Sequence, residues 1–460
     1  MKQSNINPLA GESSRRDFIK KSAVVAAAVA SANPFKTPVY GQNQAPSAGR
    51  VIGANDRLIA AYIGVGGQGT AHVLSQKENA SANNLVQAAV CDVSRNRVAV
   101  AKNRIGGDVQ GFDDHRKMLE RKDIDVVTIA TVDHWHTQCA IDAMESGKHV
   151  YVEKPMTRYL GEAFTLNDTV KRTGKTLQIG SQTCSDARWH KAAELIKGGK
   201  IGHFVMAQDS YMRNNDKGEW NYKIEDWCTP DDLNWDRWQG KVHNRIDFSA
   251  DHYFRWRKYY PYCAGLLGDL VPHRLLPLML ATGLPEFPSR VVCLGNKAVH
   301  TDRKAEGPKT PERDVPEQIE LIAEFPSGLN LLLVSSSVNQ VGLPSMIRGH
   351  KATLYIGDSR VELKPEPPFA DEIDPQTFDN LQPSGQKIPE MEKNFFDCVR
   401  SGNQPFGNID LAVRAQTVIS LAEMSQRLNL MCVFDEKTRT ITSGNGHKVD
   451  PITYGTLELS

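Results

Sequence analysis

The amino-acid sequence predicts an α/β protein in two parts: a doubly wound parallel sheet, then an α+β domain with a mostly antiparallel sheet. An apolar strand at residues 58–63 runs directly into a glycine-rich turn at Gly64. Apolar strands and helical patterns then alternate as far as residue 180, which is typical of parallel sheets because each crossover needs a helix. Beyond it, strand-like runs and the hairpin signal Pro326-Ser327-Gly328 indicate antiparallel pairing.

Composition narrows the class of protein. The 460 residues are 40% hydrophobic and 24% charged, as in ordinary globular chains of two or three domains. Because 55 Lys and Arg balance 54 Asp and Glu, we expect no nucleic acid partner. No apolar run reaches the roughly 18 residues of a membrane span, so no stable span is expected. Eight scattered cysteines without a CxxC pair predict free thiols, with no metal site.

Residues 1–32 resemble a bacterial export signal. Arg15 and Arg16 precede an Ala/Val-rich stretch that ends in Ala-x-Ala sites. Adjacent arginines before a short apolar region are typical of the twin-arginine signal, which carries folded proteins across the membrane. We therefore expect the twin-arginine export machinery as a partner, a periplasmic location, and a linker at residues 33–55. The alternatives are a chance Arg-Arg before an amphipathic helix and a cytoplasmic enzyme.

Residues 56–180 are predicted to bind a dinucleotide in a Rossmann domain. The strand at 58–63 is followed by Gly64-Val65-Gly66-Gly67-Gln68-Gly69 and then by a helical pattern. In this G-x-G-x-x-G motif Gly64 suits the tight turn, Gly66 lets the backbone approach a pyrophosphate, and Gly69 lets helix and strand pack closely. The helix N-terminus adds free N–H groups and a positive dipole end.

Asp92 follows the second apolar strand, residues 85–91, and lies 23 residues beyond Gly69. A carboxylate near this spacing accepts hydrogen bonds from the adenosine ribose. It would repel a 2′-phosphate, so NAD is favoured over NADP. The alternative is that Asp92 only caps the next turn.

Two further segments lie beyond the carboxyl ends of predicted strands, where ligands bind in such sheets. They are residues 131–136, after the strand at 125–130, and Glu153-Lys154-Pro155, after the strand at 148–152. The candidate cofactor-binding residues are Gly64, Gly66, Gly67, Gln68, Gly69, Asp92, Thr131, Asp133, His134, His136, Glu153, Lys154 and Gln182.

The remaining chain divides into residues 181–390, an α+β domain for substrate and oligomerisation, and residues 391–460, C-terminal helices and a tail. Strand-like runs occur at 202–208, 290–294, 318–325, 329–335 and 353–356. Helical patterns cover 187–198, 391–400 and 411–428. The polar stretches 296–316 and 364–389 are predicted to be long loops.

Together these motifs resemble the glucose–fructose oxidoreductase, inositol dehydrogenase and rhizopine catabolism family of NAD(P)-dependent enzymes, in its exported twin-arginine subgroup. The resemblance runs from about residue 55 to 428 and also rests on residues 265–269 followed by His273. It implies that Lys154 lies beside the nicotinamide and the substrate hydroxyl, that Asp269 and His273 supply the general base, and that the chain forms a homodimer or homotetramer. Arg274 and Leu276 replace a histidine and an aspartate of many exported members, which leaves the substrate open.

The chemistry of alcohol oxidation asks for the same residue types. An imidazole such as His273 suits removal of a hydroxyl proton near neutral pH, and Lys154 could hold the alcohol oxygen. Asp269, four residues before His273, could orient the ring from the same helix face. The alternatives are a surface lysine and a surface i,i+4 pair.

The segment 220–262 is unusually aromatic, and aromatic faces stack well on sugar rings. It is interpreted as a carbohydrate-binding wall, and the alternative is a subunit interface or a satellite core. The substrate-binding candidates are Trp256, Arg257, Tyr260 and Arg274.

The sequence as a whole therefore predicts an NAD-dependent oxidoreductase that acts on a hydroxyl of a sugar, polyol or glycoside. Because little free NAD exists outside the cytoplasmic membrane, the cofactor is expected to be tightly bound and recycled in place. One alternative is a redox-neutral glycoside hydrolase, lyase or epimerase that uses a keto-sugar intermediate. Another is a non-catalytic, nucleotide-containing sugar-binding or sensor protein.

Overall fold

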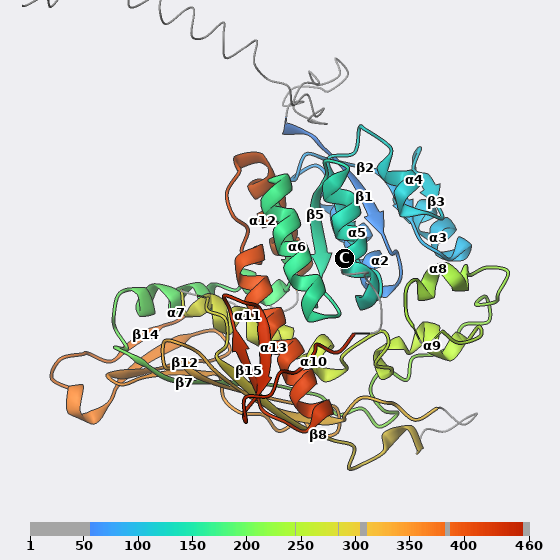
Figure 1. Ribbon diagram of the computed structural model, residues 1–460. Coiled ribbons are helices and arrows are strands. Elements are labelled where there is room, and N and C mark those ends of the chain that lie inside the picture. The colour runs from blue at the N-terminus through green and yellow to red at the C-terminus, as the bar shows by residue number, and fades with distance from the viewer. Residues whose placement is uncertain (1–55, 244, 284, 304–310, 382–386, 454–460) are drawn as a thin grey trace, which may run out of the picture. The chain divides into compact units, whose positions relative to one another are not determined.

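The computed structural model describes residues 56–243, 245–283, 285–303, 311–381 and 387–453. The predicted export signal and linker lie outside these residues. The described chain contains two sheets with helices between them, and helices α11 (Pro272–Ala281) and α13 (Ile409–Leu428) run between the two sheets (Figure 1).

The first sheet has six strands, all parallel, in the order β3-β2-β1-β4-β5-β6. The strands are β1 Leu58–Ile63, β2 Leu85–Cys91, β3 Gln110–Phe112, β4 Val126–Ile129, β5 His149–Glu153 and β6 Leu177–Gly180. The helices are α2 Gly67–Glu78, α3 Arg95–Ile105, α4 His115–Leu119, α5 Asp133–Glu145 and α6 Leu160–Thr173. Strand order reverses between β1 and β4, the place where such sheets bind ligands. The predicted doubly wound sheet is confirmed.

The second sheet has ten strands in the order β14-β13-β12-β11-β7-β10-β9-β8-β15-β16. Strands β7 and β10 pair in parallel and the other neighbours are antiparallel, as predicted. The strands are β7 Phe204–Met212, β8 Arg290–Asn296, β9 Gln318–Glu324, β10 Asn330–Ser336, β11 Met346–Gly349, β12 Ala352–Ile356, β13 Val361–Pro365, β14 Gln376–Phe378, β15 Cys432–Asp435 and β16 Thr440–Ser443. The hairpin predicted at Pro326-Ser327-Gly328 joins β9 to β10.

Several short strands fall where loops or a tail were predicted. Strand β14 lies within the predicted loop 364–389, and β15 and β16 extend the sheet from the predicted C-terminal tail. These strands have only three or four residues each. A run of that length is too short to show a period of two, so its pairing is set by the neighbouring strand rather than by its own pattern.

The C-terminal helices connect the two halves of the chain. Helix α12 (Ile388–Ser401) packs against α2 of the first half, and α13 packs against β8 and α6. Helices α7 (Ala187–Lys197) and α11 pack together over the second sheet. One cluster of buried hydrophobic side chains runs through both sheets, so the halves share a core.

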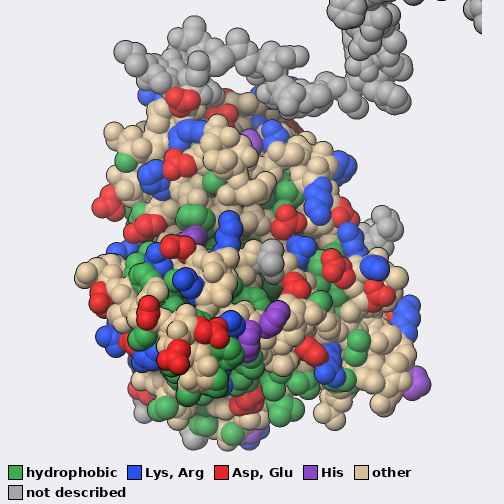
Figure 2. All heavy atoms as spheres, turned by 90° about the vertical axis from the view of Figure 1, so that its left-hand side faces the viewer, with side chains coloured by type: hydrophobic (Ala, Val, Ile, Leu, Met, Phe, Trp, Pro, Cys, Tyr) green, Lys and Arg blue, Asp and Glu red, His purple; other side chains and the backbone are tan. Residues whose placement is uncertain are grey.

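All eight cysteines are buried and free, as predicted. Among the described residues, no cluster of His, Cys, Asp and Glu could hold a metal ion, and no helix is long and apolar enough to cross a membrane. Basic and acidic side chains are interspersed over the face shown in Figure 2, in keeping with the net charge of +1.

Candidate functional site

The glycine turn between β1 and α2 has no room for side chains at two of its positions. Gly64 has a φ of +80°, and a Cβ there would lie 2.7 Å from the Thr131 backbone N. A Cβ on Gly69 would lie 2.0 Å from the Gly64 carbonyl oxygen. At Gly66 it would meet the Arg97 guanidinium at 2.7 Å. The turn therefore packs as the motif predicts, and the backbone N–H groups at the start of α2 are available to an anion.

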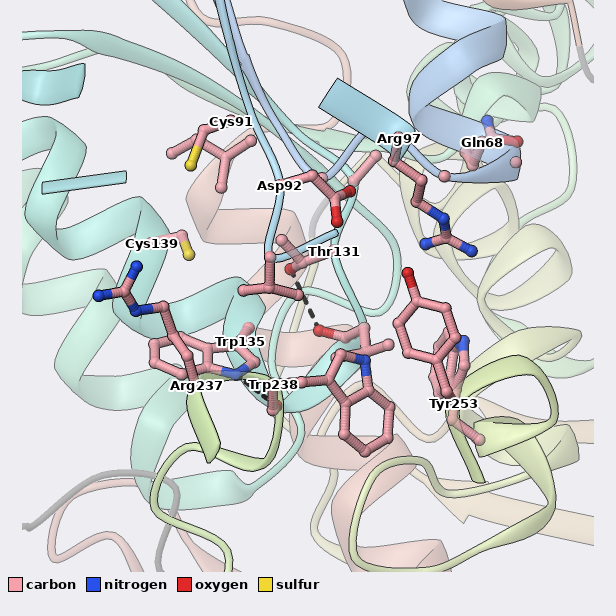
Figure 3. Close-up of a pocket in the computed structure, with 18 of the residues that line it drawn as sticks. Gln68, Cys91, Asp92, Arg97, Thr131, Trp135, Cys139, Arg237, Trp238 and Tyr253 are labelled. Atoms are coloured by element: carbon pink, nitrogen blue, oxygen red, sulfur yellow. Dashed lines mark hydrogen bonds between the residues drawn. The ribbon is translucent and has the colours of Figure 1, made fainter. Parts of the chain in front are cut away.

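A cavity of about 510 Å³ extends from this turn along the end of β2. On the side of the first sheet it is lined by Gly64, Gly66, Gly67, Gln68, Asp92, Arg97 and Thr131. Asp92 Oδ2 accepts a hydrogen bond from Val65 N at 2.9 Å, and Oδ1 accepts one from Ser94 N at 3.0 Å. Asp92 therefore does cap the next turn, and it also faces the cavity (Figure 3).

The opposite wall of this cavity comes from the aromatic segment of the second half. We call residues 227–243 and 245–257 the strap. Its Trp238, Tyr253, Phe254 and Trp256 line the cavity. Figure 3 shows Tyr253 and Trp238 below the cavity, with Asp92 and Arg97 above it. The strap includes the short helices α8 (Trp235–Gln239) and α9 (Ala250–Phe254), which lie beside α3 in Figure 1.

The strap is attached to the first sheet mainly by Asp232. Its carboxylate accepts hydrogen bonds from Ser94 Oγ at 2.5 Å and from Asn96 N at 2.7 Å, at the start of α3. The Asn234 N–H donates to the Val93 carbonyl at 3.0 Å. These bonds join residues more than 130 positions apart in the chain; Ser94 and Asp232, for example, are separated by 138 positions.

Aromatic and cationic side chains complete the attachment. Trp135 Nε1 donates to the Trp238 carbonyl at 2.8 Å, and the Arg97 guanidinium lies 4.6 Å from the Tyr253 ring centroid. Trp238, Tyr253 and Trp256 also belong to a separate hydrophobic cluster with Leu233. Most of the aromatic segment is thus a satellite core that walls the larger cavity, which is the alternative interpretation of the sequence, and only its Tyr222 and Arg257 reach the smaller cavity.

A second cavity, of about 190 Å³, adjoins the first, because Gln68, Ala130, Thr131, Tyr222 and Arg257 line both. Its other lining residues are Asp133, His136, Glu153, Lys154, Gln182, Arg213, Asp269, His273 and Ile388. The three predicted catalytic residues are therefore brought together at one end of a space that begins at the glycine turn.

Asp269 pairs with Lys154 and not with His273. Lys154 Nζ lies 2.6 Å from Asp269 Oδ1 and 2.9 Å from its carbonyl oxygen. The other carboxylate oxygen accepts from Trp220 Nε1 at 2.8 Å, and Arg257 Nε lies 3.1 Å from Oδ1. Burial raises the pKa of Asp269, but the charges of Arg257 and Lys154 outweigh it and hold that pKa well below its usual value. The expected Asp269–His273 orientation is wrong, because Asp269 ends α10 (Leu266–Asp269) while His273 lies in α11.

His273 presents a neutral imidazole to the smaller cavity. The ring is 5% exposed and stacks on Tyr211 with centroids 5.5 Å apart. Burial, with the Lys154 charge adding to it, lowers its pKa to about 3. Nδ1 is enclosed and has no hydrogen-bond partner among the described residues. A lone pair is thus available on this ring throughout the neutral pH range.

The residues at the start of α5 separate into two groups. Thr131, Asp133 and His136 line the smaller cavity, and His136 Nδ1 contacts the Pro155 carbonyl at 2.7 Å. Burial raises the pKa of Asp133, whose Oδ2 has no partner in the part of the chain that the structure describes. His134 lines neither of the two adjoining cavities. It points to the strap, where its Nε2 contacts the Trp238 carbonyl at 3.0 Å.

The predicted substrate-binding residues are also divided. Arg257 lines both cavities and Trp256 lines only the larger one. Tyr260 lies outside both and donates from Oη to Gln426 at 3.0 Å. Arg274 also lies outside both and is directed to Asp209, with Nη1 3.9 Å from Oδ2. Of the four, only Arg257 is placed to contact a substrate beside Lys154.

The sequence analysis missed four residues that shape the site. Arg97 and Asp232 hold the strap, and His72 and Glu392 support Glu153 from behind through a hydrogen bond of 2.7 Å between them. The helical pattern of α2 could have placed His72 on the buried face of the helix. No sequence pattern, however, connects His72 with a glutamate 320 residues away.

The donor set fits a dinucleotide. The glycine turn leaves space that a Cβ would fill, the Asp92 carboxylate faces the larger cavity, and Asp133 is among the residues that line the smaller one. Comparison with known proteins agrees. Residues 59–181 match the model of an oxidoreductase family with an NAD-binding Rossmann fold. This segment is thus an NAD-binding domain of the oxidoreductase type.

Curated relatives and solved structures extend the likeness beyond that domain. An α-N-acetylgalactosaminidase of Shewanella oneidensis is 28% identical over 235 residues, which is 47% of this chain and 50% of the relative. The chain thus spans about half the length of the curated relatives it matches.

Two solved structures share the fold. Levoglucosan dehydrogenase in complex with NADH and levoglucosan has a TM-score of 0.62 at 18% identity, over 82% of this chain and 98% of that one. The aldose–aldose oxidoreductase of Caulobacter crescentus has a TM-score of 0.61 at 17% identity, over 82% and 100%. At this identity the likeness concerns the fold alone.

Proposed function

We propose that this protein is an NAD-dependent oxidoreductase that acts on a hydroxyl group of a sugar, polyol or glycoside. The observation that carries the proposal is the meeting of Lys154, Asp269 and His273 at the end of the cleft that begins at the glycine turn. An ammonium, a carboxylate and a neutral imidazole in one cavity are the groups that alcohol oxidation requires. The sugar-acting neighbours of the same fold support the substrate class.

When bound, NAD supplies a nicotinamide ring that accepts the hydride from the alcohol carbon. The chain's own residues then manage the proton. The Lys154 ammonium, held in place by its ion pair with Asp269, donates a hydrogen bond to the alcohol oxygen and stabilises the negative charge that develops on it. His273 accepts the hydroxyl proton at Nε2, since Nδ1 is enclosed. Burial, which lowers the pKa of His273 to about 3, leaves the ring unprotonated before the reaction, so that it can accept a hydrogen bond from the hydroxyl.

The cofactor stays on the protein between turnovers. The strap supports this part of the proposal, because it forms one wall of the larger cavity and is attached to the first sheet through Asp232 and Arg97. A retained cofactor also suits the periplasmic location and the export machinery expected from residues 1–32, since free NAD is scarce outside the cytoplasmic membrane.

A redox-neutral reaction is the second candidate. It is favoured by the match to an α-N-acetylgalactosaminidase and to glycosyl hydrolase family 109 proteins of Shewanella species. Such a reaction would oxidise a hydroxyl, promote elimination or epimerisation next to the new ketone, and return the hydride to the product. The same Lys154 and His273 would serve both redox steps.

The chain also assembles as a homo-oligomer through its larger sheet. Val292 and Leu294 on β8 and Ile322 on β9 are exposed on the sheet, while Val291, Cys293 and Leu321 are buried on the other side. Large apolar side chains gathered on one sheet face favour a second copy as the covering surface. The mass measured by light scattering checks this.

The test of the function begins with purification without added cofactor. We expect nicotinamide absorbance and extractable NAD in the folded protein. Incubation with glycosides and 3-keto-glycosides should then yield products of changed mass. An oxidoreductase should leave the bound cofactor with a net change of redox state, whereas a redox-neutral enzyme should leave its redox state unchanged. Absence of NAD refutes retention, and a protein that holds NAD but turns over no sugar is a binding or sensor protein instead.

A further inference from the structure

Helix α2 carries a fully buried histidine between two buried carboxylates. His72 Nε2 lies 2.8 Å from Glu153 Oε1, and Nδ1 lies 2.7 Å from Glu392 Oε1. The side chains of His72 and Glu392 are completely enclosed, and that of Glu153 is 6% exposed. Three elements meet here: α2, the end of β5 and α12. The mechanism above does not use His72 or Glu392.

The hydrogen bonds around His72, Glu153 and Glu392 indicate how many protons the His72 ring carries. A neutral imidazole has a single N–H, so it cannot donate to both carboxylates. Both carboxylates are also surrounded by donors. Glu153 Oε1 accepts from Gln68 Nε2 at 3.0 Å and from Gln182 Nε2 at 2.8 Å.

Glu392 is surrounded in the same way. It accepts from Ser75 Oγ at 2.6 Å and from Gln76 Nε2 at 2.9 Å. The Gln76 amide cannot be turned round, because its Oε1 accepts from Tyr62 Oη at 2.7 Å. Amide donors on both glutamates, and a carboxylate oxygen at each ring nitrogen, are the arrangement expected of a His72 ring that carries two protons.

We infer that His72, held as an imidazolium between Glu153 and Glu392, is a positioning residue for the catalytic end of the cleft. It fixes Glu153, and Glu153 in turn orients the amides of Gln68 and Gln182, which line the smaller cavity beside Lys154. The inference rests on the proposed function in one respect, that this cavity is where the reaction occurs.

The charge on His72 is what keeps the two carboxylates together. Without it, two buried negative charges would repel each other and one would have to take up a proton. If Glu153 took up that proton, its carboxyl would carry one O–H donor and would accept less strongly from the amides of Gln68 and Gln182. The titratable groups facing His72 are Glu153 and Tyr151 from β5 and Glu392 from α12, with Tyr62 of β1 reached through Gln76.

The pKa of His72 agrees with this geometry. Burial lowers it, but the hydrogen bonds to Glu153 and Glu392 and their negative charges outweigh burial and raise it to about 9. The imidazolium therefore persists across the neutral pH range.

A substitution of Glu392 tests the inference without changing the lining of either cavity. It bonds His72, Ser75 and Gln76 and lines neither cavity. Glu392→Gln keeps the shape and removes one negative charge. Glu390→Gln, on the exposed side of the same helix, removes an equal charge without touching His72 and is the matched control.

The measurement is the protonation of His72 in the NAD-loaded full chain labelled with 15N-histidine. Long-range 1H–15N NMR distinguishes an imidazolium from either neutral tautomer, and His72→Gln assigns the signal. We expect both ring nitrogens protonated at pH 7. Glu392→Gln should lower the pKa of His72 by about 1 to 3, as loss of an adjacent opposite charge does, and Glu390→Gln should leave it unchanged.

A second readout separates positioning from stability. With any sugar that reduces the bound NAD, the alkaline fall of the rate should move to lower pH in Glu392→Gln by the amount that the His72 titration moves. A merely structural role would lower the Tm and leave the pH profile in place.

A singly protonated His72 at pH 7, or a titration that Glu392→Gln does not alter, would overturn the inference. If His72→Gln does not fold, the signal is assigned by its through-space contact with Tyr151, whose ring centroid lies 5.0 Å from that of His72. NMR needs no substrate, so a protein with protonated His72 and no sugar turnover would contradict the proposed function alone.

Discussion

Replacing Asp232 by alanine should release the nucleotide faster. Asp232 is half-buried, and its carboxylate receives two hydrogen bonds at the start of α3, from Ser94 Oγ and from Asn96 N. The position also places a negative charge at the positive end of the α3 dipole. These interactions hold the strap against the first sheet, and we expect them to break if the strap moves away.

The size of the effect follows from those two bonds. A hydrogen bond to a charged group contributes about 1.5–3 kcal/mol, and water replaces part of it at a half-buried site. We take about 2–3 kcal/mol as the loss for the closed strap. At about 1.4 kcal/mol per factor of ten, the rate of nucleotide release should rise about 30- to 150-fold.

The assay loads the protein with NADH and follows the decay of its fluorescence after mixing with excess NAD. Asp231→Ala is the control, because its side chain is exposed and lies next to Asp232 in the chain. A release rate in Asp232→Ala within twofold of that in Asp231→Ala would show that the nucleotide leaves without opening the strap.

Three further predictions concern the site, the glycine turn and pH. Lys154→Ala should lower kcat by about 10²- to 10⁴-fold while extractable NAD stays at the wild-type level, because Lys154 acts on the alcohol oxygen; an equal loss of NAD would place it in cofactor binding instead. Gly69→Ala should reduce NAD content and Tm, since its Cβ would meet the Gly64 carbonyl oxygen at 2.0 Å, whereas Gly67→Ala, with open space around the position, should keep both. Buried His134 and His273, each with a pKa lowered to about 3, take up protons only on unfolding, so stability should fall as pH drops below about 6.5, by about 2 kcal/mol per histidine at pH 5. The stability contribution of His72, whose pKa is raised to about 9, depends on pH in the opposite direction. It is complete below pH 6.5 and is lost as the pH rises through 9. Urea unfolding at pH 5, 7 and 9.5 measures the expected loss of stability on the acid and on the alkaline side. A free energy of unfolding that does not change with pH would contradict the assigned burial of these histidines.

The nucleotide domain could be predicted from the sequence because its signals are local. Strand β1 is buried on both faces and appears as one continuous apolar run, β2 is apolar except for Gln87, and the bounds of both agree with the prediction. The glycines lie beside each other in the chain and in space. Asp92 follows its strand directly, so a spacing rule was sufficient to find it.

The contacts that assemble the site are not local, and the sequence pattern does not contain them. The four-residue spacing of Asp269 and His273 predicted a pair on one helix face, but the chain changes helix between them and Lys154, 115 residues away, takes the carboxylate. In the same way, the aromatic segment was interpreted as a carbohydrate-binding wall, and the structure shows its alternative, a satellite core. Its place beside the glycine turn depends on Asp232 meeting α3, which composition does not encode.

Both ends of the cleft are completed by the second half of the chain. At the glycine turn the strap supplies the outer wall, and at Lys154 helices α10 and α11 supply Asp269 and His273. A nucleotide that spans the two cavities would therefore contact both halves at once, and it would stabilise their junction in proportion to its own affinity. The two attachments differ in strength, because the Lys154–Asp269 pair is buried with Trp220 and Arg257 around it, whereas the Asp232 bonds are half-exposed. We therefore expect the strap to open before the Lys154 end of the cleft when a nucleotide is exchanged.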